Sequence, residues 1–227
     1  FHKGNFLHLH NFEHVLTGVD RSPETKLDAQ YYGDVRNFPY EIIESIDSIV
    51  YLAAISNDPM GNQFQKITKE VNHISAINIA KKGLELGAKS FVFASSCSVY
   101  GFAENGMRTE TSDLNPLTAY AKSKINAEKD LENIATNDYR ITCLRFATAC
   151  GFSPRLRLDL VLNDFVASAM VNNKIEILSD GKPWRPLIHV QDMALAIDWA
   201  INRDVNNGGK YLSINAGSNN WNYQIED

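Results

Sequence analysis

Cysteine is scarce in this sequence, and its pattern excludes the common metal motifs. Cys97, Cys143 and Cys150 are the three cysteines, and their spacing matches no zinc motif. Because an odd number cannot pair completely, we expect buried free thiols in a reducing compartment. The histidines near the start, such as His8 and His10, lack the carboxylate or cysteine partners that would complete a site. We therefore expect no metal.

Long apolar runs are also absent, as is any excess of positive charge. No apolar run approaches the roughly 18 residues that a membrane span needs. The first residues lack the unbroken apolar core of a signal peptide, so we expect a soluble, cytoplasmic protein with no membrane partner. The net charge of −5 gives a field that does not favour polyanions. Nucleic acid is therefore not expected as a partner.

The sequence does contain short apolar runs that alternate with helical patterns. Hydrophobic residues make up 44% of the chain and charged residues 22%, an ordinary globular balance. Such alternation predicts an α/β fold, a doubly wound parallel sheet with helices on both faces. A change of character near residue 151 predicts a smaller lobe after it. The predicted strands are 14–19, 31–35, 48–54, 91–95, 140–147, 174–178 and 210–216; the predicted helices are 41–46, 62–86, 119–135, 160–171 and 190–202.

Polar residues follow several of the predicted strands, where ligands bind in parallel sheets. Asp20 closes the strand over 14–19, and at this place in a dinucleotide fold a carboxylate accepts hydrogen bonds from the adenosine ribose. It would also repel a 2′-phosphate, so it favours NAD over NADP. The neighbouring Arg21 weakens this inference, and Asp20 as a simple turn residue is the alternative. The other residues at strand ends are Asp34, Ser56, Asn57, Ser95 and Ser96.

The segment from 91 to 124 contains the groups that predict catalysis. Tyr120 and Lys124 are four residues apart on a predicted helix, so both side chains lie on one face. A cation beside a phenol favours the phenolate and lowers a pKa that normally lies near 10. A phenol tuned in this way can act as a general acid–base near neutral pH. The hydroxyl of Ser96, at the end of the preceding strand, could hold a substrate oxygen.

Five motifs, in order and in spacing, resemble the extended short-chain dehydrogenase/reductase family. They are LAA (52–54), SSCSVYG (95–101), NPLTAYAKSK (115–124), LRFATACG (144–151) and RPLIHVQDMA (185–194). The resemblance covers nearly the whole chain and is closest to the branch of NAD-dependent nucleotide-sugar epimerases and dehydratases, the UDP-glucose 4-epimerase-like enzymes. It implies a Rossmann-like NAD-binding domain over residues 1–150 and a substrate lobe over 151–227. It also implies a homodimer formed through the helices over 62–86 and 119–135.

The resemblance implies a role for each matching residue. Tyr120 would be the catalytic base, Lys124 would lower its pKa and bind the nicotinamide ribose, and Ser96 would be the active-site hydroxyl. Asn72 matches a family asparagine in a helix. The implied NAD contacts are Asp34, Val35, Leu52, Ala53, Ala54 and Lys124, together with the Asp20 inferred above. The implied contacts with the nucleotide sugar are Ser56, Ser96, Thr148 and Arg185.

Departures from the family pattern narrow the reaction. Cys97 and Ser98 stand where the sugar dehydratases carry an Asp-Glu pair that removes water. Thr148 replaces an asparagine that often touches the sugar nucleotide. Arg155 and Arg157 could face a substrate diphosphate or carboxylate, or belong to a solvated loop.

The G-x-x-G-x-x-G turn and its strand are missing, so we expect the NAD-binding domain to be partial at its start. The chain also stops where the substrate lobe normally continues, so we expect the lobe to be partial. GNFLHLHNFEH (4–14) could be a remnant of the helix after the glycine turn.

The sequence therefore predicts NAD-dependent epimerisation of a nucleotide sugar, expected at C4, with Tyr120 as base. Two alternatives stay open. A reductase or dehydrogenase on the same scaffold would consume NAD(P)H with its substrate, whereas an epimerase would not. A non-catalytic dinucleotide-binding sensor or scaffold would have no need of the tuned phenol.

Overall fold

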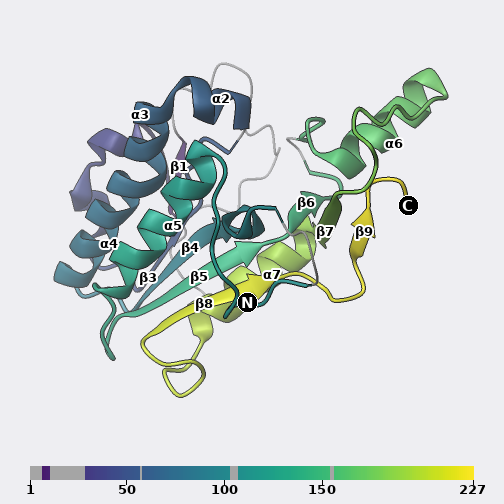
Figure 1. Cartoon of the computed structure of the whole chain (residues 1–227). Helices are drawn as coiled ribbons and strands as arrows, with labels where there is room; N and C mark the ends of the chain where they lie inside the picture. Colours follow the sequence, from purple (N-terminus) through teal and green to yellow (C-terminus); the bar gives the residue numbers. More distant parts are fainter. Residues whose placement is uncertain (1–6, 11–28, 57, 103–106, 154–155) are drawn as a thin grey trace.

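The computed structural model describes residues 7–10, 29–56, 58–102, 107–153 and 156–227, and its centre is a four-stranded parallel sheet. The strands β3 (Ser48–Tyr51), β4 (Ser90–Ser96), β5 (Arg140–Phe146) and β8 (Tyr211–Ala216) lie in the order β3-β4-β5-β8 (Figure 1). The parallel α/β fold predicted from the sequence is confirmed, and it is Rossmann-like.

Helices cover both faces of this sheet, and β4 shows why residues 91–94 form a continuous apolar run. Phe91 and Phe93 pack into one hydrophobic core, which includes residues of α4 (Ala76–Glu85) and α5 (Ala119–Glu132). Val92, between them, points to the other core, which is covered by α7 (Val190–Asn202). A central strand buried on both faces has no polar side to present, which explains the continuous apolar run.

The region predicted as one helix over 62–86 is helical but interrupted. It consists of α2 (Asp58–Gln63), α3 (Gln65–Lys69), the π-helical turn η3 (Glu70–Ser75) and α4. The break lies at Phe64, whose φ of −119° and ψ of 51° are not helical. The π-helical turn that follows has the wider i→i+5 spacing. Gly87, expected to end the helix, does so with a φ of +85°.

A second, smaller sheet lies beside the first. Its strands are β6 (Thr148–Cys150), β7 (Trp184–His189) and β9 (Asn222–Gln224), with β6 parallel and β9 antiparallel to β7. The helix α6 (Val161–Asn172) lies beyond this sheet, away from the main one (Figure 1). The small sheet begins at β6, just before residue 151. The division of the chain into two domains near residue 151 remains a prediction.

Three expectations from the sequence need correction or lie outside the structure. No strand forms over 174–178, where every residue is exposed and no neighbouring strand pairs with the segment. The segment over 7–10 is a strand, β1 (Leu7–His10), not helix, and it pairs in parallel with β2 (Ala29–Tyr32). The strand over 14–19 and Asp20 lie outside the described residues.

Short 3₁₀ turns complete the described structure: η1 (Val35–Asn37), η2 (Tyr40–Ile43) and η4 (Cys97–Tyr100). The turn η2 stands where a short helix was predicted over 41–46. Among the helices that the structure describes, none combines the length and the apolar character needed to cross a bilayer.

Candidate active site

A cleft of about 1270 Å³ opens where β3, β4 and β5 end. Parallel strands all point their carboxyl ends to one edge of a sheet, so residues far apart in sequence meet there. The cleft brings together most of the residues that the sequence singled out. Its lining includes Leu52, Ala54, Ser56, Ser96, Tyr120, Lys124, Thr148, Arg157 and Arg185.

The first turns of α5 place Tyr120 and Lys124 in this cleft. The helix begins after Thr118, whose side-chain oxygen accepts a hydrogen bond from the amide of Ala121 at 3.2 Å. The ammonium nitrogen of Lys124 lies 5.5 Å from the centre of the Tyr120 ring and 4.5 Å from that of Phe93. The predicted placement of phenol and lysine on one helix face is therefore confirmed.

Burial controls the charge of Lys124. The side chain is only 1% exposed, and burial lowers its pKa from 10.5 to about 7. Cys143 and Glu128 act in the opposite direction and raise the pKa, but they do not outweigh burial. In the protein alone, the lysine thus exchanges its proton close to neutral pH.

Burial is also the largest influence on the pKa of Tyr120, but here it raises the pKa, because the charged form of tyrosine is the deprotonated one. Burial raises its pKa to about 12, while the side-chain hydrogen bond with Ser96 and the charge of Arg157 lower it. The sequence predicted a pKa below 10 because of Lys124. That prediction is wrong for the protein alone: the lysine is not among the groups that shift the phenol, and removal from water disfavours the phenolate.

The segment after β4 is a tight turn that fixes Ser96. The side-chain oxygen of Ser96 accepts a hydrogen bond from the amide of Ser98 at 3.2 Å and so caps η4. Gly101 then adopts a φ of +67° and a ψ of −146°, a conformation that glycine alone adopts readily. A Cβ at this position would lie 1.9 Å from the backbone oxygen of Asn115. The turn cannot relax around a larger residue.

The two residues in place of a dehydratase's acidic pair are not ionised groups. Burial raises the pKa of the Cys97 thiol, which keeps it neutral at pH 7. The hydroxyl oxygen of Ser98 is buried and has no hydrogen-bond partner among the described residues. Neither side chain is a carboxylate, so the Asp-Glu pair of the resembling sugar dehydratases is not present at these two positions.

Asn72 connects the end of β3 to α5. Its side chain, 0% exposed, accepts from the amide of Ile55 at 2.8 Å and donates to the carbonyl of Ile55 at 3.0 Å. It also donates to the hydroxyl of Ser123 at 3.1 Å, and that hydroxyl donates to the carbonyl of Tyr120 at 2.6 Å. The asparagine thus holds the loop after β3 against the helix turn that carries Tyr120.

Two arginines, Arg157 and Arg185, line the cleft beside several acidic side chains. Arg157 donates to the hydroxyl of Ser56 at 2.9 Å and pairs with Asp159 at 2.6 Å. Arg185 is exposed and donates to the carbonyl of Trp184 at 3.0 Å. Guanidinium groups present planar pairs of donors that match phosphate and carboxylate oxygens. Arg157 lies in the irregular segment between β6 and α6, and its side chain lines the cleft, so its role toward a substrate stays a prediction.

Three predicted cofactor residues lie away from the cleft lining. Asp34 caps η1 and pairs with Arg36, which is the largest cause of its lowered pKa. The side chain of Val35 is buried in the core, and Ala53 packs against the same core. Leu52 and Ala54, by contrast, form part of the wall. Ala54, with its small side chain, shares this lining with Lys124.

Comparison with known proteins adds to this geometry. The family model "NAD dependent epimerase/dehydratase family" matches residues 6–217. The uncharacterised UDP-glucose epimerase YtcB of Bacillus subtilis (strain 168) is 30% identical over 69% of this chain and 49% of its own length. A dTDP-glucose 4,6-dehydratase of Streptomyces griseus is 26% identical over 82% of this chain and 56% of its own length. The chain spans about half the length of these curated relatives.

Solved structures agree on the fold. A UDP-glucose 4-epimerase from Thermotoga maritima, determined with UDP-glucose, superimposes with a TM-score of 0.78 and 20% identity. The match covers 97% of this chain and 71% of that one.

Proposed function

The chain belongs to the NAD dependent epimerase/dehydratase family, whose cofactor is NAD, and we propose that it epimerises a nucleotide sugar at C4. One observation carries the proposal: Ser96, Tyr120 and Lys124 line one cleft, in which Lys124 lies 5.5 Å from the centre of the Tyr120 ring. These three groups can move one proton and hold one oxygen, which is what reversible oxidation of a sugar alcohol requires.

Each of the three side chains has a distinct task. When bound, NAD would accept and return the hydride and would bring a positive nicotinamide ring. The phenolate of Tyr120 accepts the proton of the sugar hydroxyl and later returns it. The hydroxyl of Ser96 holds the same oxygen while it becomes a ketone. The ammonium of Lys124 would add positive charge beside the phenol and would bind the nicotinamide ribose, and Leu52 and Ala54 would hold the ring.

The remaining polar residues of the cleft would bind the nucleotide sugar. Arg185 would pair with the diphosphate, and Arg157 is placed to contact a diphosphate or carboxylate. Ser56 and Thr148 would contact the substrate by their hydroxyl groups. Asp34 and the backbone of Val35 would contact the adenosine end of NAD, together with Asp20.

The neutral Cys97 and Ser98 favour epimerisation over dehydration. The resembling sugar dehydratases carry an acidic pair at these two positions, and this chain has only a thiol and a hydroxyl there. A reductase or dehydrogenase is the second candidate, because the same three groups serve one-way hydride transfer. A non-catalytic sensor is disfavoured by the intact Ser96, Tyr120 and Lys124 set.

We further propose a cytoplasmic homodimer. Exposed apolar side chains such as Phe64, Ile74 and Leu84 lie on the segment from α2 to α4 and suit a helical interface. Residues 1–150 would form the NAD-binding domain and residues 151–227 part of the substrate lobe.

The test uses the full-length protein with NAD and a panel of nucleotide sugars, analysed by chromatography and mass spectrometry. An epimerase gives a product of unchanged mass, a dehydratase a product lighter by one water, and a reductase consumes NAD(P)H. We expect the wild type to form an isomer of unchanged mass and Tyr120→Phe to form none. Turnover that survives Tyr120→Phe unchanged would refute the mechanism.

A further inference from the structure

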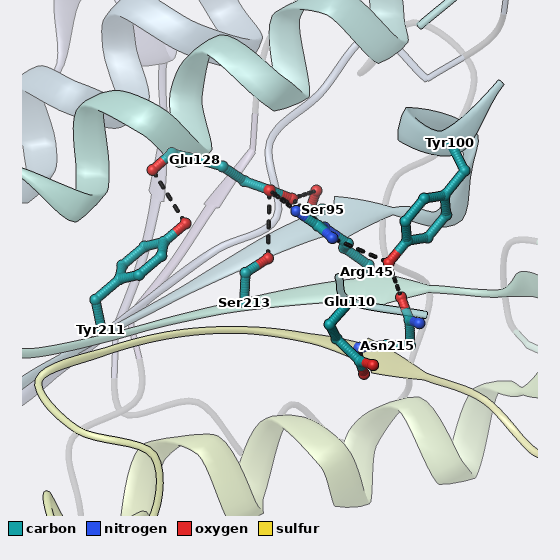
Figure 2. A network of polar contacts seen from close by, with 8 residues as sticks. All are labelled: Ser95, Tyr100, Glu110, Glu128, Arg145, Tyr211, Ser213 and Asn215. Carbon is teal, nitrogen blue, oxygen red and sulfur yellow. Dashed lines mark hydrogen bonds and ion pairs between the residues drawn. The ribbon is translucent and has the colours of Figure 1, made fainter. Parts of the chain in front are cut away.

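A buried ion pair joins Arg145 to Glu128 at the centre of a network of polar contacts (Figure 2). Arg145 on β5 approaches the carboxylate of Glu128 on α5 with two nitrogens: Nη2 lies 2.7 Å from Oε2, and Nε lies 3.1 Å from Oε1. The two side chains are 6% and 4% exposed. Such a two-pronged geometry is rigid as well as strong.

The pair holds both ends of the turn that carries Ser96. The hydroxyl of Ser95 donates to Glu128 at 2.5 Å, and Nη1 of Arg145 donates to the phenol oxygen of Tyr100 at 2.9 Å. Tyr100 in turn donates to Asn215 at 2.6 Å. Because Ser95 and Tyr100 flank residues 96–99, the ion pair connects to the chain before and after Ser96.

Sheet register makes this arrangement possible. Ser95 of β4 lies beside Arg145 of β5, and Arg145 lies beside Asn215 of β8. Two parallel pairings therefore align three polar residues across the sheet next to the carboxyl edge. Ser213 adds a further hydrogen bond to Glu128 at 3.2 Å.

Glu128 also acts on the lysine of the site. Tyr120, Lys124 and Glu128 follow one another at intervals of four residues, so they form one stripe along α5. The ammonium of Lys124 donates to the carbonyl of Ala94 at 2.7 Å. The described groups that shift its proton equilibrium by charge are Cys143 on β5 and Glu128, and both favour the ammonium.

We propose that Glu128 is a positioning residue of the active site: held by Arg145, its carboxylate fixes the turn that carries Ser96 and acts on Lys124, one turn away on the same face of α5. Its catalytic meaning rests on the proposed function, but its action on Lys124 does not. A merely structural ion pair is the alternative, because buried pairs often contribute little net stability and serve to define one packing.

The decisive measurement is the titration of Lys124 in the full-length protein. Lysine labelled with ¹³C at Cε gives one NMR signal for each lysine side chain. The signal of Lys124 is the one that disappears in Lys124→Met. Glu128→Gln keeps the size of the side chain and removes its charge. We expect the pKa of Lys124 to fall below its wild-type value. If turnover needs the ammonium, the alkaline limb of the pH–kcat profile moves to lower pH.

Two further variants keep the test valid if Glu128→Gln is unstable. Glu128→Gln combined with Arg145→Met removes both charges and leaves no unpaired buried ion, so it should regain stability. Arg145 is not among the groups that shift the pKa of Lys124, so in this double variant that pKa should also lie below its wild-type value. Glu132→Gln, an exposed carboxylate one turn further along α5, is the matched control and should leave it unchanged.

The possible outcomes separate the proposals. A Lys124 that titrates as in the wild type in both Glu128 variants overturns the positioning role, whatever their stability. A shifted titration in a protein that turns over no nucleotide sugar refutes the proposed function and leaves the positioning role standing.

Discussion

The ammonium of Lys124 donates a hydrogen bond of 2.7 Å to the carbonyl oxygen of Ala94, which ties this lysine to the end of β4. Burial at this place lowers the pKa of Lys124 from 10.5 to about 7. The sheet thus holds the lysine in place, and the side chain changes from charged to neutral around pH 7.

This burial predicts how stability depends on pH. Between pH 7 and 10.5 the unfolded chain keeps the Lys124 proton and the folded chain loses it. More protons are then bound in the unfolded state, so stability rises with pH across this window. Relative to Lys124→Met, the unfolding free energy of the wild type should rise by up to about 1.4 kcal/mol per pH unit. Urea denaturation of the wild type and of Lys124→Met from pH 6 to 10 measures this difference. If the unfolding free energies of the two proteins changed with pH in parallel, the effect of burial would be contradicted.

Ser96→Ala should move the acid limb of the pH–kcat profile. The hydrogen bond from Ser96 lowers the pKa of Tyr120, so its loss raises that pKa and requires a higher pH to form the phenolate. We expect kcat to fall about 100-fold at neutral pH. Ser98→Ala is the matched control, since that hydroxyl has no hydrogen-bond partner among the described residues. An equal shift in both variants would remove the special role of Ser96.

Gly101→Ala should destabilise the fold strongly. Its new Cβ would meet the backbone oxygen of Asn115 at 1.9 Å, in a conformation already strained for alanine. We expect a loss of about 3 kcal/mol. Gly87 also has a positive φ, +85°, but a Cβ added there would have no atom within 4 Å. Gly87→Ala should therefore cost about 1 kcal/mol of stability. Chemical denaturation of the two variants compares them, and equal losses would show that the turn at Gly101 can move.

Arg157→Ala should weaken substrate binding more than it slows the chemical step. The guanidinium lines the cleft and already donates to Ser56, so it is placed to meet an anionic group. We expect KM to rise about tenfold or more, the size of one lost charge-assisted hydrogen bond. Lys66→Ala, which alters a lysine that is 90% exposed, serves as the control. An unchanged KM in Arg157→Ala would assign Arg157 to the loop alone.

Local spacing allowed much of the site to be predicted. Tyr120 and Lys124 lie four residues apart on a helix, and that interval fixes a shared face whatever surrounds it. Alternating apolar runs predicted the parallel sheet, and the sheet brings Ser56, Ser96 and Thr148 to one edge. The strand over 174–178 was wrong because strand formation depends on a neighbour, and none pairs with that segment.

By itself, then, the sequence determined which groups face the cleft: a phenol, an ammonium and a hydroxyl. Only the tertiary structure decided their proton equilibria, because burial, which no local pattern reveals, raises the pKa of Tyr120 and lowers that of Lys124. Tertiary structure also paired Glu128 with Arg145, which are 17 residues apart on different elements. That contact follows from how α5 lies on the sheet and from strand register, which are long-range properties of the fold.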